Sequence, residues 1–261
     1  MKSCVEYHLL RPRAMTERRD AMPVAYIGLG ILEWHGLQNP LGLDAIKSHG
    51  IACHLAEKFG GVVMPPMYWG DHRSDIAELD FDGSFPIPFA EPENDFDHTV
   101  PICEHYGVEK ERLVKDGEHS GSYGGWEFWE KLLVRAMFQT EAMGFKSIVL
   151  IPGHFHQIDA SKRAIERYNG EGGKCRTLVL SEFAFENVGK DLVGDHAASF
   201  ETSLMLALCP ELVDISELDA NMAVPNIGVI GLDPRKHASK EVGEKILAKF
   251  AETAEAFILQ K

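Results

Sequence analysis

The sequence predicts an α/β fold, in which a mostly parallel sheet carries helices on both faces. Short apolar stretches alternate along the chain with longer segments whose apolar residues recur every three or four positions, as in strand–helix–strand units. The expected strands are continuously apolar, a pattern typical of strands buried on both faces. With 261 residues and 45% hydrophobic content, the chain can form a sizeable core, and we expect one domain over residues 1–261.

The first half contains two expected strands and one helix. Residues 24–32 form the first strand. A helix follows from Asp44 to the glycine pair at 60–61, because its apolar side chains recur every four residues and glycine commonly ends helices. Residues 62–66 form the second strand. From about 71 to 120, prolines interrupt an acidic segment, which predicts an elaborated loop region within the domain.

The second half repeats this alternation and ends in an amphipathic helix. The expected elements, in order, are a helix over 126–145, a strand over 147–153, a helix ending near Tyr168, a strand over 177–183, a helix over 197–208 and a helix over 240–259. Together with the first half, they predict a mostly parallel sheet covered on both sides.

The net charge limits the kinds of partner that the chain can bind, and the cysteines indicate its redox compartment. A formal net charge of −14 argues against binding to nucleic acid or to an anionic membrane surface. Five scattered cysteines without a CxxC pair favour free thiols in a reducing compartment over disulfides. The first residues lack the apolar core of a signal peptide, and no apolar run reaches 18 residues. We therefore expect a cytoplasmic protein that acts on a small molecule.

Carboxylates and imidazoles follow two of the expected strands. Glu33 and His35 are two residues apart, so in an extended backbone both would project from the same side of the first strand's end. Asp44 follows closely, although alone it is also typical of a helix N-cap. His154 and His156 repeat the two-residue spacing after the third strand. These side chains predict a site for Zn, Mn, Fe or Ni rather than for Ca or Mg.

A third polar cluster opens the expected helix over 197–208. Asp195 and His196 lie at its start, and Glu201 follows a little over one turn later. Taken alone, Glu201 reads as a solvated surface residue. The dinucleotide fingerprint, the GxSxG elbow, the HExxH motif and the phosphate-binding loop are all missing from the sequence, so these other chemistries are not indicated.

In order, the three clusters resemble motifs of the creatininase (creatinine amidohydrolase) family. The segment from Glu33 to Asp44 resembles its E-x-H-G-x-H-x-P-x-x-x-D motif, PGHFHQ its N-G-H-x-x-N turn, and HAASFETSLMLAL its H-A-G-x-x-E-T-S helix start. VMPPMYWG and GLDPRKHASKEVGEKI are similar to two further stretches of the family. The resemblance covers most of the chain outside residues 71–120. It implies a three-layer α/β sandwich, often a homohexamer, and a hydrolase that cleaves amide-like C–N bonds through a metal-bridging hydroxide.

The resemblance also implies which residues hold two divalent metal ions (Zn, Mn, Fe or Ni). Asp44 would bridge the two ions, Glu33 and His154 would complete one site, and His35 would hold the other. The last ligand is either His156 or Glu201, since both residue types bind first-row metals.

Proton transfer to the leaving nitrogen is assigned by the resemblance to Asp195 and His196. The family closes a tryptophan over its flat substrate, whereas residues 185–200 contain no tryptophan here. The asparagines of the N-G-H-x-x-N turn are replaced by Pro152 and Gln157. These departures predict a small cyclic amide or a formamide other than creatinine. Two alternatives are a deformylase for a nucleotide-derived formamide and a non-catalytic metal-binding or assembly protein.

Overall fold

A four-stranded parallel sheet forms the centre of the computed structural model, which describes residues 4–69, 99–109, 125–186 and 188–260. The strands are ordered β2–β1–β3–β4, with β1 at Val24–Leu29, β2 at Val62–Val63, β3 at Ser147–Pro152 and β4 at Arg176–Val179. β1 and β3 pair along their whole length. Because all pairs are parallel, the carboxyl ends of the strands meet at one edge, where ligand sites of open α/β sheets lie.

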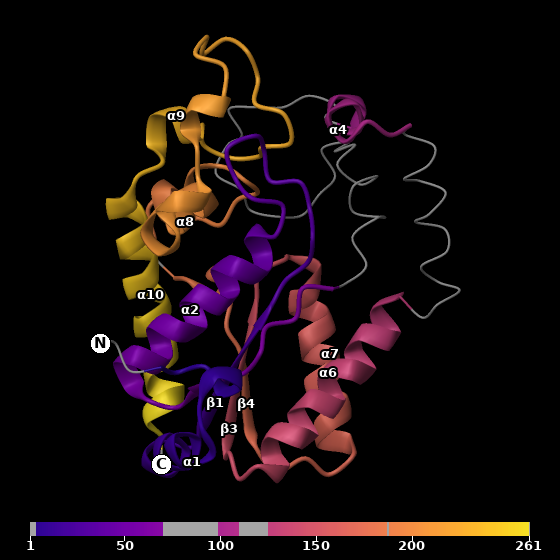
Figure 1. Cartoon of the computed structure of the whole chain (residues 1–261), viewed down its shortest axis with the longest axis vertical. Coiled ribbons are helices and arrows are strands. Elements are labelled where there is room, and N and C mark those ends of the chain that lie inside the picture. The colour runs from indigo at the N-terminus through magenta and orange to yellow at the C-terminus, as the bar shows by residue number, and fades with distance from the viewer. Residues whose placement is uncertain (1–3, 70–98, 110–124, 187, 261) are drawn as a thin grey trace.

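Helices cover both faces of this sheet (Figure 1). The helices α2 (Leu43–Phe59), α8 (Ser199–Leu208) and α10 (Lys240–Leu259) share a core with one face, and α6 (Gly125–Ala142) and α7 (His156–Gly170) share a core with the other. Neighbouring strand residues alternate between these cores, as pleated strands require: Tyr26 belongs to the first and Ile27 to the second. The predicted α/β fold class is confirmed.

Three further α-helices lie among the described residues, beside several short 3₁₀ helices: α1 (Pro12–Ala21), α4 (Thr99–Tyr106) and α9 (Pro234–His237). The predicted loop region over 71–120 lies largely outside the described residues, but α4 falls within it and corrects the prediction there. Pro101 occupies the first turn of α4, a position where proline does not interrupt a helix. Ile102 of the same helix is fully buried against Trp34.

All four strands end earlier than the sequence suggested, β3 by one residue and the other three by more. β1 stops at Leu29, where pairing on the β2 side continues only as an isolated parallel bridge between Leu29 and Met67. β2 is followed by Met64 and then by the proline pair Pro65–Pro66, which lacks the N–H groups needed to extend pairing. Beyond Val179, β4 meets Pro152 of β3, which likewise has no N–H to donate.

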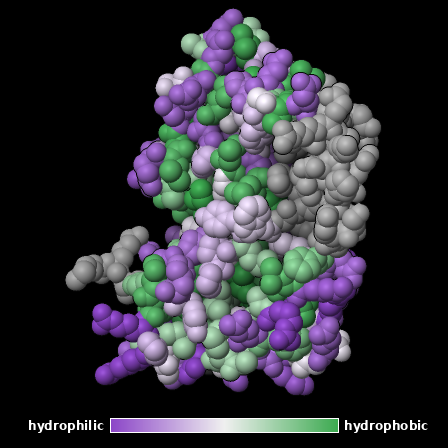
Figure 2. Space-filling model, turned by 45° about the vertical axis from the view of Figure 1, so that its right-hand side comes forward, coloured by the Kyte–Doolittle hydropathy of each residue, from purple (hydrophilic) through white to green (hydrophobic). Residues whose placement is uncertain are grey.

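Three further features concern the hydropathy of the surface, the length of the apolar helices and the state of the cysteines. Figure 2 shows hydrophilic and hydrophobic residues interspersed over one face, with hydrophilic residues gathered along its lower part. No described helix is long and apolar enough to cross a membrane. All five cysteines are free thiols, as predicted.

Candidate metal centre

The first turn of α2 lies directly against the ends of two strands, and two glycines make this contact possible. A Cβ atom on Gly30 would lie 2.1 Å from the backbone nitrogen of Ala45, and one on Gly153 would lie 2.1 Å from the carbonyl oxygen of Asp44. Both distances are far below van der Waals contact, so only glycine permits this approach. The two glycines thereby bring Asp44 to the ends of β1 and β3.

Glu33 and His35 reach the site from an irregular segment and not from the strand itself. The prediction that strand alternation orients these two side chains was wrong, because β1 ends four residues before Glu33. A hydrogen bond from the backbone nitrogen of Glu33 to the carbonyl of Leu41, at 2.9 Å, closes the loop instead. The Nδ1 atom of His35 lies 3.1 Å from the carbonyl oxygen of Glu33, which fixes the orientation of the imidazole ring.

Asp44 is the centre of the polar cluster. It is not the helix N-cap, a position taken by Gly42, and the residue is 1% exposed. Its Oδ1 atom lies 3.1 Å from Nε2 of His35, and its Oδ2 atom lies 3.5 Å from Nδ1 of His154. One carboxylate therefore faces imidazoles from two different strand ends.

Three overlapping groups of potential metal ligands surround Asp44. They are Glu33, Asp44 and His154; His35, Asp44 and Glu201; and Glu33, His35 and His196, with the ligand atoms of each group within 4.8 Å of one another. Two links are equally short, from Oε2 of Glu33 to Nδ1 of His154 and from Oδ1 of Asp44 to Nε2 of His35, both at 3.1 Å. The structure thus brings together all but one of the metal ligands predicted from the sequence.

The remaining predicted ligand, His156, lies at the rim of the cluster. Its Nδ1 atom is 3.1 Å from Nε2 of His154, and no group of potential ligands among the described residues includes it. Glu201 lies deeper, with Oε2 at 3.8 Å from Nε2 of His35. Both oxygens of Glu201 already accept other hydrogen bonds, from the backbone nitrogen of Ala197 at 2.6 Å and from Lys47.

His196 and Asp195 lie before α8, which begins at Ser199 and therefore later than predicted. The backbone of His196 exchanges two hydrogen bonds with Ile230, at 3.0 and 2.8 Å, and its ring centroid is 4.8 Å from that of His35. The carboxylate of Asp195 instead accepts the backbone N–H groups of Phe200 and Glu201, at 2.7 and 3.2 Å. Asp195 thus caps α8, because its carboxylate accepts N–H groups that have no acceptor within the first turn of the helix.

The sequence did not point to two charged residues of the site, Lys47 and Glu182. Lys47 lies one turn after Asp44, is 2% exposed and donates to Glu182, at 3.3 Å, and to Glu201. Its Nζ atom also lies 3.9 Å from Oδ1 of Asp44. Lys47 precedes Ile51 by four residues, so it occupies the apolar stripe of α2. A lysine on a buried stripe is a signal that could have identified it.

Neighbouring charges favour the protonated form of His35 and the ionised form of Glu33, although burial opposes both. Burial alone would lower the pKa of His35, but Asp44 and Glu201 raise it to about 9. Burial would raise the pKa of Glu33, yet His154 and His196 hold it at about 2. In the metal-free protein, His35 therefore carries a proton at neutral pH beside ionised carboxylates.

Two buried polar atoms of the cluster bear on what the site can bind and do. Oδ2 of Asp44 and Nε2 of His196 have no hydrogen-bond partner among the described residues. Buried polar atoms without partners are costly, and a metal ion would satisfy the Asp44 oxygen, whereas Nε2 of His196 remains available for proton transfer. Carboxylate oxygens and imidazole nitrogens form a donor set that suits Zn, Mn, Fe or Ni.

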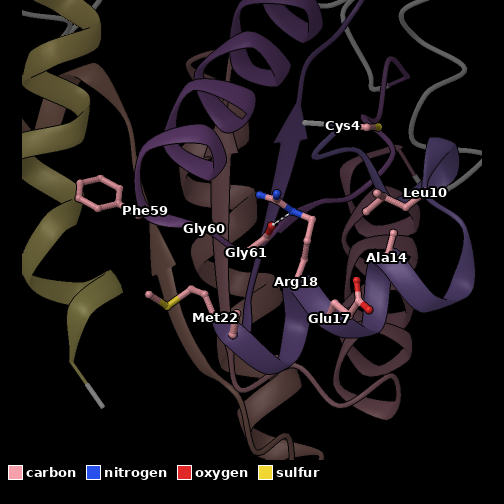
Figure 3. A pocket seen from close by; sticks show the side chains of 10 residues that line it. Cys4, Leu10, Ala14, Glu17, Arg18, Met22, Phe59, Gly60 and Gly61 are labelled. Carbon is pink, nitrogen blue, oxygen red and sulfur yellow. Dashed lines mark hydrogen bonds between the residues drawn. The ribbon is translucent and has the colours of Figure 1, made fainter. Parts of the chain in front are cut away.

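A separate cavity lies at the opposite end of the sheet. Its volume is about 570 Å³, and Figure 3 shows α1 and the Gly60–Gly61 turn on its sides. The guanidinium of Arg18 donates to the carbonyl of Gly61 at 2.9 Å (Figure 3). Since this turn leads into β2, the cavity opens at the amino ends of the strands, away from the polar cluster.

Comparisons with known proteins agree on one family. The sequence model of the creatininase family, described as creatinine amidohydrolase, matches residues 125–258, just over half of the chain. A creatinine amidohydrolase of Pseudomonas putida is 26% identical over 239 residues, covering 86% of this chain and 84% of that protein.

Solved structures have the same fold. A candidate creatinine amidohydrolase from Bacteroides fragilis has a TM-score of 0.67 at 19% identity, covering 99% of this chain and 96% of that one. A creatininase variant of Zn-Zn type has a TM-score of 0.63 at 20% identity, with 98% and 97% coverage. A structure described as creatininase Mn has a TM-score of 0.63 at 21% identity, with 98% of both chains covered.

Proposed function

Because the chain belongs to the creatininase family, we propose that it is a metal-dependent amidohydrolase, cleaving a C–N bond of a small cyclic amide or formamide. The observation that carries the proposal is the position of Asp44, which is common to two groups of potential metal ligands. Buried carboxylates gathered with imidazoles are costly unless they are paired or coordinate a metal.

Two divalent ions, Zn, Mn, Fe or Ni, are proposed for this centre. Glu33, Asp44 and His154 would hold one ion, and His35 with Asp44 would hold the other, completed by Glu201 or His156. The Zn-Zn and Mn forms of the structural relatives support this choice of metals. Two such ions lower the pKa of a shared water and polarise the substrate carbonyl.

The other residues of the site would orient groups and move a proton. Burial lowers the pKa of His196, so its ring is neutral and Nε2 can accept a proton, close to Glu33 and His35. We assign to His196 the transfer of that proton to the leaving nitrogen. Asp195 contacts the start of α8 and would keep the His196 backbone in place.

Metal binding to the metal-free protein is expected to release a proton from His35. Because Asp44 and Glu201 raise the pKa of His35 to about 9, a metal must displace its proton below that pH. Apparent affinity should therefore rise by up to about tenfold per pH unit towards pH 9. Calorimetric titration in two buffers of different ionisation enthalpy measures the protons released. Equal heats in both buffers at pH 7 would contradict this assignment.

The substrate class can be tested with a panel of amides. The Pseudomonas putida relative is named for creatinine, but the absence of tryptophan from residues 185–200 supports another substrate. Metal-loaded protein should hydrolyse at least one hydantoin, lactam or formamide faster than creatinine, as measured by chromatography of the products. A preference for creatinine would refute the substrate assignment. A fully metal-loaded chain inactive across the panel would favour a non-catalytic metal-binding protein, and formate release from a nucleotide-derived formamide would favour a deformylase.

A further inference from the structure

A second cluster of potential metal ligands lies outside the candidate metal centre and shares no residue with it. It consists of Glu6, His49 and Cys53, whose ligand atoms lie within 4.8 Å of one another. Nε2 of His49 is 2.8 Å from Oε1 of Glu6 and 3.8 Å from Sγ of Cys53. All three side chains are partly buried, with that of His49 19% exposed. These contacts join an imidazole, a carboxylate and a thiol.

The fold holds these ligands on two independent supports. His49 and Cys53 are four residues apart on α2, so they lie on the same face of the helix. Glu6 comes from the N-terminal segment, where the backbone nitrogen of Val63 donates to the carbonyl of Val5 at 2.9 Å. Glu6 itself forms a parallel bridge with Val63. The cluster therefore connects the N-terminal segment, beside β2, to the middle of α2.

The chemistry of the three side chains suits zinc. Thiolate, imidazole and carboxylate are the protein ligands of Zn²⁺, which is usually four-coordinate. The charges of one thiolate and one carboxylate would balance a divalent cation at a partly buried position. His8 lies outside this group of three, and its Nε2 atom is 3.9 Å from Oε1 of Glu6, so the fourth position would be taken by His8 after a side-chain rotation or by water.

We propose that Glu6, His49 and Cys53 form a structural site for a thiophilic divalent cation, best matched by Zn²⁺, with His8 or water as the fourth ligand. The bound ion fastens the N-terminal segment to α2, the helix that also carries Asp44 and Lys47. An ordinary hydrogen bond between Glu6 and His49 is the competing explanation, and it gives Cys53 no part in binding.

Cobalt substitution tests this proposal without any substrate. The reduced, metal-free chain is titrated with Co²⁺, because a thiolate bound to Co²⁺ gives a near-ultraviolet charge-transfer band that carboxylates and imidazoles do not give. The candidate metal centre contains no cysteine among its proposed ligands, so the band reports only the second site. We expect the band in the unaltered chain, its loss in Cys53→Ser, and its weakening in Glu6→Gln.

The neighbouring thiol provides the matched control. Cys4 is exposed, and its Sγ atom lies 3.8 Å from the carbonyl oxygen of Glu6. Cys4→Ser should leave the band intact. A Co²⁺ titration without the band, or a band that survives Cys53→Ser, would overturn the proposal. Cobalt that stays bound to Cys53→Ser after gel filtration, measured by inductively coupled plasma mass spectrometry, counts the ions in the Asp44-centred site, so failure of either site is recognised separately.

Discussion

Replacing Asp44 with asparagine is expected to remove about two metal ions per chain and to abolish hydrolysis. The two carboxylate oxygens of Asp44 face His35 and His154, at 3.1 and 3.5 Å, so both proposed metal positions depend on this side chain. Asparagine keeps the size of the side chain but loses its charge and one ligand oxygen. Metal content after gel filtration, measured by inductively coupled plasma mass spectrometry, should fall by about two ions relative to the unaltered chain.

Two further variants make this result specific. Glu33→Gln removes a ligand of the position shared with His154 and should cost about one ion per chain. Asp159→Asn changes an exposed aspartate in the first turn of α7 and should cost none. Gly42, not Asp44, is the N-cap of α2, so the Asp44→Asn chain should remain folded. Loss of a single ion in Asp44→Asn would mean that this residue does not bridge.

Metal content per chain also decides whether Glu201 or His156 is the last ligand of the position held by His35 and Asp44. Glu201 lies 3.8 Å from the His35 nitrogen, but its oxygens are held by Lys47 and by the backbone of Ala197. His156 has neither constraint, yet in this structure it approaches only His154 among the proposed ligands. Whichever of Glu201→Gln and His156→Asn loses about one ion per chain identifies the ligand.

Local signals explain which parts of the fold were predictable. The C-terminal helix spans Lys240–Leu259, as its periodicity predicted, because a twenty-residue amphipathic pattern specifies both face and length. Strand ends were less predictable: β1 ends at Leu29, and its last pairing on the β2 side is a bridge to Met67, a residue far along the chain. The helix at Thr99–Tyr106 was missed because Pro101 was taken as an interruption.

The site was predictable where residue type and position at strand ends agreed, and less so where charges pair over long sequence distances. Glu33 and His35 lie together near Asp44, as expected, but a loop and not a strand orients them. Lys47 and Glu182 were missed because nothing local announces a pair 135 residues apart. Only the position of Lys47 on the apolar stripe of α2 hinted at burial.

The Lys47→Met variant is expected to lose about 3–5 kcal/mol of unfolding free energy in the metal-free protein, as measured by urea denaturation. Lys47 is 2% exposed and supplies the positive charge beside Glu182 and Glu201, which are also buried. Methionine fills a similar volume, so the loss would come from carboxylates left without a cation and not from a cavity. Such a loss is a large part of the typical stability of a domain.

Two controls test whether unpaired buried carboxylates cause this loss: removal of an exposed ion pair, and the pH dependence of the unfolding free energy. Lys162→Met removes a pair with Asp159 whose side chains are 60% and 73% exposed, and should cost less than about 1 kcal/mol. Burial already raises the pKa of Glu182 although Lys47 opposes the shift, so losing Lys47 raises it further. A carboxyl whose pKa is higher folded than unfolded gains protons on folding, so the deficit of Lys47→Met should shrink as pH falls from neutral towards 4.5, the ordinary pKa. A deficit that stays constant over this range would instead mean that methionine packs poorly and that Lys47 contributes through shape.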